Sequence, residues 1–184
     1  MKVLCVPDYA FEYELIREHI NGMGLYLDRD VLESNFAYRQ IIPYVVLRNS
    51  EGKILTYKRQ TSSSEDRLRG QYTIGIGGHV EEKDGIGWMA VHKASGREIR
   101  EEIGVIPLLM DGNITIIRLH ETEVDRAHLG IGMVLKKWAG KIIPSKEVPS
   151  WEWKTVEELK AMELETWARY MLEYRLGYEA NKER

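Results

Sequence analysis

One helical segment, bracketed by glycines and set among β-branched runs, constrains the fold of this chain more than any other feature. Residues Trp88 to Ile103 carry apolar side chains at helical spacing, and Gly104 follows as a stop signal. The segment comes after a strand-like run that ends in Gly77-Gly78. Along the chain the order is strands, helix, strands, helix. This order predicts an α+β fold in which helices pack on the faces of a mixed sheet.

The other predicted elements are short and separated by turn residues. Strands are expected in the β-branched and aromatic runs at residues 41–47, 53–58, 72–76, 113–120 and 129–138. Two further helices are predicted over residues 8–22 and 155–176. Asp8 is expected to cap the first helix, and Thr155 with Glu158 forms a capping box at the second.

Composition and the absence of linkers limit the domain count and the partners. No stretch rich in Gly, Ser or Pro divides the chain of 184 residues, so we predict a main domain over residues 40–184 and an N-terminal extension, residues 1–39, packed on it. Cys5 is the only cysteine, which excludes an internal disulfide and predicts a cytoplasmic protein. The net charge of −3 and the lack of a long apolar run disfavour nucleic acid and exclude a membrane-spanning segment. A homodimer stays open.

Three glutamates on the central helix carry the chemistry that the sequence suggests. Glu98, Glu101 and Glu102 are spaced i, i+3 and i+4, which places them on one helix face with Cβ atoms about 5–6 Å apart. Like charges repel at that distance unless a cation lies between them, and Mg²⁺ prefers carboxylate oxygens. Arg97 is able to hold a carboxylate by two hydrogen bonds. The alternative interpretation is a solvated helix face, the usual role of a Glu/Arg run.

The region from Gly78 to Val105 resembles the Nudix box of MutT-like hydrolases, G-x5-E-x7-R-E-U-x-E-E-x-G-U with U aliphatic. Residues Arg97–Val105 read REIREEIGV and match the second half of that pattern position by position. The resemblance covers about residues 40–175. It implies an α/β/α sandwich with a mixed sheet, the Nudix helix and a C-terminal helix. It also implies hydrolysis of a nucleoside diphosphate linked to another moiety, a small nucleotide substrate, with Mg²⁺ or Mn²⁺ as cofactor.

The resemblance also assigns roles to individual residues. The implied catalytic residues are the acidic helix residues and their arginine: Arg97, Glu98, Glu101 and Glu102. The implied metal ligands are the same three glutamates and the glycine that opens the box: Glu98, Glu101, Glu102 and Gly78. The general base is one of these glutamates or a glutamate of a later loop, Glu121 or Glu123. Residues expected to contact the substrate are His79, Arg59, Arg69 and His128.

Two departures from the family pattern concern the loop before the helix. Gly78 and Arg97 are five positions further apart than the pattern allows, and Met89 stands where its first glutamate is expected. A thioether is a soft ligand and does not suit a hard cation. We therefore expect an acidic residue of the lengthened stretch (Glu81, Glu82 or Asp84) to point toward the helix glutamates, directly or through a metal-bound water. Otherwise the loop is an exposed turn.

The departures leave alternative functions to weigh. A Nudix-fold module that binds nucleotides or regulates without turnover is one, and Met89 favours it. The intact set of Arg97 and the three glutamates favours an enzyme. An isopentenyl diphosphate isomerase needs a cysteine in its cleft, and Cys5 lies far upstream of the first predicted hairpin. The sequence does not identify the substrate.

Overall fold

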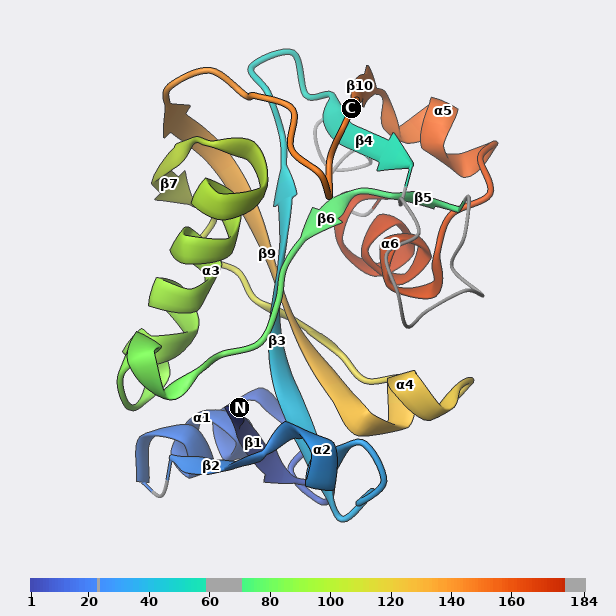
Figure 1. Cartoon of the computed structure of the whole chain (residues 1–184). Helices are drawn as coiled ribbons and strands as arrows, with labels where there is room; N and C mark the ends of the chain where they lie inside the picture. The colour runs from blue at the N-terminus through green and yellow to red at the C-terminus, as the bar shows by residue number, and fades with distance from the viewer. Residues whose placement is uncertain (23, 59–70, 178–184) are drawn as a thin grey trace. The chain divides into compact units, whose positions relative to one another are not determined.

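The computed structural model describes residues 1–22, 24–58 and 71–177, which form β-sheets and helices (Figure 1). The strands are β1 (Lys2–Pro7), β2 (Leu25–Asp28), β3 (Tyr38–Leu47), β4 (Ile54–Lys58), β5 (Tyr72–Thr73), β6 (Gly75–Ile76), β7 (Ile106–Met110), β8 (Thr115–Ile117), β9 (His128–Ala139) and β10 (Glu152–Lys154). The helical elements are α1 (Tyr13–Gly22), α2 (Arg29–Leu32), η2 (Glu82–Asp84), α3 (Trp88–Ile103), α4 (Glu123–Ala127), α5 (Val156–Lys160), α6 (Thr166–Met171) and η3 (Leu172–Leu176).

The larger sheet is mixed. Its strand order is β2-β1-β3-β9-β7, with β6 on β3 and β8 on β9, and a smaller sheet has the order β10-β4-β5. The pairs β1–β2, β1–β3 and β7–β9 are antiparallel. The neighbours β3 and β9 run in the same direction in Figure 1. The predicted order of strands and helices is therefore confirmed. Within the described ranges, no helix is long and apolar enough to cross a bilayer.

The chain forms two compact units, each assembled from three stretches of sequence. The first contains residues 1–44, 77–98 and 116–132, and the second contains residues 45–76, 99–115 and 133–184. The elements β3, α3 and β9 contribute residues to both units.

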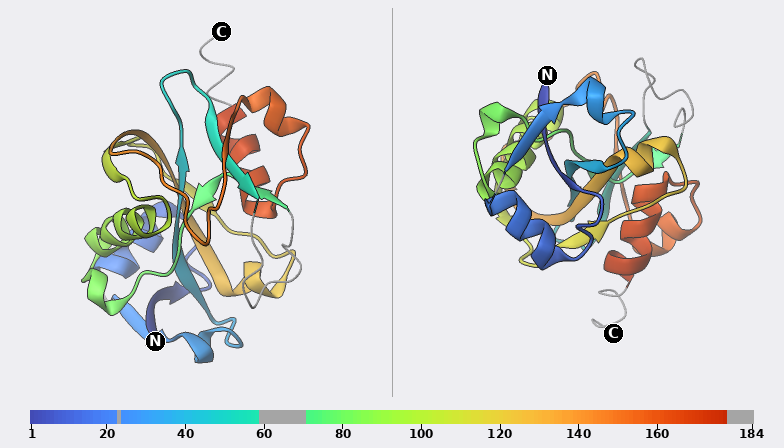
Figure 2. Two further views of the ribbon diagram at one scale, coloured as in Figure 1. Left: turned by 45° about the horizontal axis from the view of Figure 1, so that its top comes forward. Right: turned by 90° about the horizontal axis from the view of Figure 1, so that it is seen from below.

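In the first unit, the N-terminal segment supplies two strands that the sequence did not predict. β1 pairs with β2 on one edge and with the start of β3 on the other. Val3 and Cys5 form a small core with Leu32 of α2. The segment is blue in both views of Figure 2. The helix predicted from residue 8 begins only at Tyr13, because the carboxylate of Asp8 binds arginine side chains and does not cap a helix.

In the second unit, the predicted C-terminal helix is interrupted. α5 ends at Lys160, α6 begins at Thr166, and the capping box of Thr155 and Glu158 is present as predicted. In the gap, the backbone N–H of Glu165 donates to the carbonyl of Tyr72, and the hydroxyl of Thr73 donates to the buried carboxylate of Glu165. Pairing with β5 replaces the helical hydrogen bonds at this point.

We expect Gly77→Ala to destabilise the protein, because the backbone of Gly77 lies directly on another strand. A Cβ at this position would be 1.9 Å from the carbonyl oxygen of Pro43, and we expect the free energy of unfolding to fall by about 3 kcal/mol. The matched control is Gly96→Ala inside α3, where nothing lies within 4 Å of the new Cβ. This change should raise stability by about 0.5–1 kcal/mol. Chemical denaturation measures both, and equal stability of Gly77→Ala and wild type would contradict the packing argument.

Candidate functional site

Arg97 joins the loop before α3 to the first glutamate of the site. Its Nε and Nη2 atoms donate to the two carboxylate oxygens of Asp84 at 2.9 and 2.8 Å. Its Nη1 atom donates to Glu98 at 2.5 Å, and Nη2 also donates to the carbonyl oxygen of His79 at 2.9 Å. A guanidinium presents its donors in a rigid plane, so these contacts fix the positions of three groups at once. The orientation of Glu98 is therefore set by an ion pair.

The ion pair between Asp84 and Arg97 is ionised at neutral pH. Burial by itself raises the pKa of Asp84, but hydrogen bonds from Arg97 and from the backbone N–H of Glu81 outweigh it and hold the pKa below its ordinary value. The pKa of Arg97 is raised, first by its hydrogen bond to Asp84 and then by Glu98, against the effect of burial. The side chain of Asp84 is only 4% exposed. A buried carboxylate of this kind needs its cationic partner.

Asp84 is the acidic residue of the lengthened loop that reaches the helix. Glu81 lies 3.7 Å from the Nη2 atom of Arg97, and Glu82 is largely exposed. The alternative of an exposed turn is therefore wrong for Asp84, which is buried. Its carboxylate oxygens bind Arg97. A contact with the helix glutamates through a metal-bound water stays a prediction.

The N-terminal segment supports the same loop from the other side. The hydroxyl of Tyr26 donates to the carbonyl oxygen of Gly85 at 2.7 Å. The side-chain oxygen of Asn21 accepts a hydrogen bond from the backbone N–H of Trp88 at 2.8 Å and so caps the start of α3. Gly85 and Gly87 have φ values of +105° and +67°, which glycine adopts without strain. The additional residues thus form an ordered connection.

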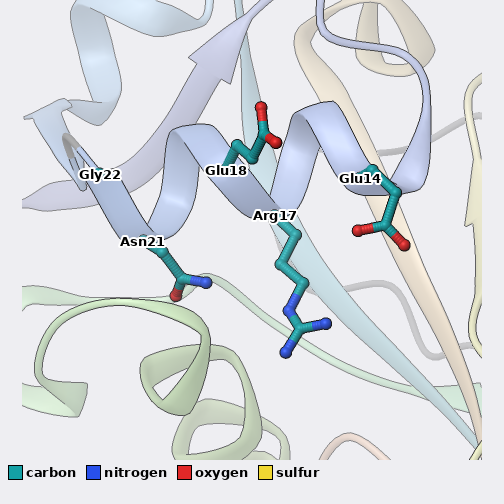
Figure 3. A pocket seen from close by; sticks show the side chains of 5 residues that line it. All are labelled: Glu14, Arg17, Glu18, Asn21 and Gly22. Carbon is teal, nitrogen blue, oxygen red and sulfur yellow. The ribbon is translucent and has the colours of Figure 1, made fainter.

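Asn21 also belongs to an open, polar hollow on the surface of α1 (Figure 3). The hollow is lined by Glu14, Arg17, Glu18, Asn21 and Gly22. All five residues come from this one helix, and none of them is among the site residues that the sequence predicts. The hollow therefore adds no group to the candidate site.

Gly78 lies against the carboxylate of Glu98. A Cβ on Gly78 would be 2.5 Å from Cδ and Oε1 of Glu98, so only glycine allows the backbone to approach this closely. Glu98 is 15% exposed, and α3 continues to Ile103, so Glu101 and Glu102 follow on the next turn of the same helix.

These groups offer the oxygen donors that a hard cation such as Mg²⁺ or Mn²⁺ prefers, and the donor set fits that cofactor. Among the described residues, no three His, Cys, Asp or Glu side chains are gathered closely enough to hold a metal ion. The ligand set of Glu98, Glu101, Glu102 and Gly78 stays a prediction.

The structure brings together the two histidines that the sequence placed near the substrate. The rings of His79 and His128 contact edge to face, with centroids 5.5 Å apart. His128 is buried and its Nδ1 lies 2.7 Å from the carbonyl oxygen of Val124, so Nδ1 carries the proton. Burial, with nearby Arg29 and His128, lowers the pKa of His79 to about 3, and the ring is neutral at pH 7. Its Nε2 atom is buried and makes no hydrogen bond. Arg59 and Arg69 lie outside the described residues.

The sequence analysis missed Arg39, a buried arginine at the start of β3. Its side chain is 2% exposed. It reaches the segment between β8 and β9, which carries the candidate bases Glu121 and Glu123 and leads into His128. The available signal was a charged residue just before a β-branched run, a position at which a strand has already begun.

Comparisons with known proteins point to one family. A model of the NUDIX domain matches residues 39–174. Protein YmaB of Bacillus subtilis (strain 168) is 29% identical over 151 residues, which are 77% of this chain and 73% of that protein. The crystal structure of Tm1382, a candidate Nudix hydrolase, has a TM-score of 0.78 and 27% identity and covers 97% of this chain and 100% of its own.

A more distant structure agrees in fold. The NUDIX domain of Shewanella oneidensis NrtR, solved in complex with ADP-ribose, has a TM-score of 0.58. It is 13% identical and covers 84% of this chain and 94% of its own. At this identity the likeness shows a shared fold.

We expect Asp84→Asn to lower the free energy of unfolding by about 2 kcal/mol at pH 7, because Arg97 then keeps its buried position without a full counter-charge. Glu82→Gln, an exposed change in the same loop, should alter it by less than about 0.5 kcal/mol. Thermal or urea unfolding measures both.

The effect of Asp84→Asn should also depend on pH. The folded pKa of Asp84 is below the ordinary value, so its contribution is present above pH of about 4 and is lost as the pH falls through the folded pKa. The gap between wild type and variant should therefore close in acid. A gap that stays constant down to pH of about 2 would exclude the ion pair as its source.

Proposed function

The chain belongs to the Nudix family, and we propose that it is a metal-dependent hydrolase that cleaves a diphosphate bond in a nucleoside diphosphate linked to another moiety. Family membership, together with the mixed sheet and its helices, establishes the predicted α+β Nudix fold, in which α3 is the Nudix helix. The observation that carries the proposal is the position of Glu98. Gly78 lies against its carboxylate, and Arg97, itself held by Asp84, orients it.

In this proposal Glu98, Glu101, Glu102 and the backbone of Gly78 hold Mg²⁺ or Mn²⁺. The bound ion supplies neutralisation of charge on the phosphoryl oxygens and makes a water more acidic. Arg97 keeps Glu98 in one orientation, so that little reorganisation is needed when the substrate arrives. A glutamate accepts the proton of the attacking water. The candidates are the helix glutamates, Glu121 and Glu123.

His79 and His128 are the proposed contacts for the substrate. Both rings are close to the glycine that meets Glu98, and the neutral ring of His79 has a buried nitrogen without a hydrogen-bond partner. Such an atom gains a partner when a ligand supplies one. Arg59 and Arg69 remain proposed phosphate contacts from the sequence alone. The ADP-ribose complex of the NrtR domain supports a small nucleotide as the ligand class.

A panel of nucleoside diphosphate derivatives tests the activity. We propose to include ADP-ribose, nucleotide sugars and dinucleoside polyphosphates, each with Mg²⁺ and with Mn²⁺. A coupled phosphatase releases inorganic phosphate from newly exposed phosphate monoesters. Turnover of at least one compound is expected. Binding of several compounds without turnover of any would favour the nucleotide-binding module over the hydrolase.

We expect the activity to vanish in excess EDTA and to return when Mg²⁺ or Mn²⁺ is added. The helix glutamates repel one another and the diphosphate of the substrate unless a cation lies between them. The assay is the coupled phosphate release on the best substrate of the panel. Full activity in excess EDTA would refute the metal requirement.

We expect Glu101→Gln and Glu102→Gln each to reduce turnover by roughly 10²–10⁴-fold, the range typical of a lost catalytic group. Loss of one of several like charges should leave the fold intact or slightly more stable without metal. The control is Glu18→Gln, the same change on an exposed turn of α1. Kinetics and a thermal melt decide the outcome. Rates close to wild type for both site variants would reduce these residues to a solvated helix face.

A further inference from the structure

Arg39 binds one short segment of the chain at several points. Its Nη1 atom donates to the carbonyl oxygens of Leu119, Asp125 and His128 at 3.1, 2.8 and 3.2 Å. Its Nη2 atom lies 3.1 Å from Nδ1 of His120. Both ends of the segment 119–128 are therefore gathered around one guanidinium. A lysine has no planar fork with which to make these bonds together.

Asp8 of the N-terminal segment supplies the counter-charge. It accepts a hydrogen bond from Nε of Arg39 at 2.5 Å and another from Nη2 of Arg118 at 3.1 Å. Burial raises the pKa of Asp8, but the two arginines outweigh that effect and hold it below its ordinary value. Asp8 is thus charged at neutral pH. A buried guanidinium needs such a partner.

The contacts continue from Arg39 to the candidate site. The carbonyl group of His128 is bound by Arg39, and its ring lies against the ring of His79. His79 directly follows Gly78, which meets the carboxylate of Glu98. Every step in this series is a contact between described residues of the first unit. The segment itself contains only the short helix α4, capped by Thr122, so it has few hydrogen bonds of its own.

We infer that Arg39 and Asp8 are positioning residues, which hold segment 119–128 so that His128 lies against His79 at the substrate site. The N-terminal segment is then part of the site, although its residues do not touch the substrate. The inference rests on the proposed function only in assigning substrate contact to the two histidines. The position of the segment is independent of that assignment.

The closing experiment uses the full chain without metal and compares Asp8→Asn and Arg39→Lys with wild type. Asp8 is 38% exposed, so Asp8→Asn is compatible with folding even if Arg39→Lys is not. The control is Glu51→Gln, which removes an exposed carboxylate paired with Lys53. Backbone amide hydrogen exchange and the nuclear Overhauser effects between the rings of His79 and His128 are measured for each protein.

We expect both variants to accelerate amide exchange in residues 119–128 by about tenfold or more, while exchange in α3 stays as in wild type. The ring-to-ring effects between His79 and His128 should weaken. Glu51→Gln should change neither. Unchanged exchange in the segment, unchanged ring contacts, or an equal acceleration throughout α3 would overturn the inference, the last because it indicates a general loss of stability.

Kinetics add a separate result. On a substrate found in the panel, Asp8→Asn should raise KM by about tenfold with kcat within about twofold, because the metal-binding residues keep their positions. The Mg²⁺ concentration for half activation should not change. A fall in kcat with constant KM would overturn the substrate-positioning role. If wild type hydrolyses no compound, the proposed function fails, while exchange and ring contacts still decide whether Arg39 and Asp8 position the segment.

Discussion

The bidentate ion pair between Arg97 and Asp84 is the interaction on which the candidate site depends. It fixes the guanidinium, and the guanidinium then fixes Glu98 and the carbonyl group of His79. Because Gly78 precedes His79 and meets Glu98, the loop and the helix approach each other at a defined distance. A carboxylate that is oriented before the substrate arrives needs little further ordering.

Two arginines solve the same physical problem in two loops. Arg97 holds the connection before α3, and Arg39 holds the segment before β9. Both connections are largely irregular, so most of their carbonyl groups have no strand or helix partner. A guanidinium satisfies several carbonyl and carboxylate oxygens at once, which a lysine or a neutral side chain does not. Each arginine is itself balanced by an aspartate, Asp84 or Asp8.

The lengthened loop shows how a motif can depart from its pattern and retain a function. Met89 replaces the expected acidic residue and is exposed. The carboxylate comes from Asp84, five positions earlier, and the intervening residues turn through glycines with positive φ and are held by Tyr26 and Asn21. Shape and charge at Arg97 are kept, although the spacing along the sequence is not. For this reason a strict spacing rule understates the match.

The sequence by itself determined the Nudix helix, with its bounds at Trp88 and Ile103, its stop at Gly104 and its acidic face. These properties are local, because helical spacing and a glycine with a φ of +74° act within a few residues. The interruption of the C-terminal helix, the strand β1 and the contacts of Arg39 were decided by the tertiary structure. Each depends on hydrogen bonds to residues distant in the sequence, and a local pattern does not contain those partners.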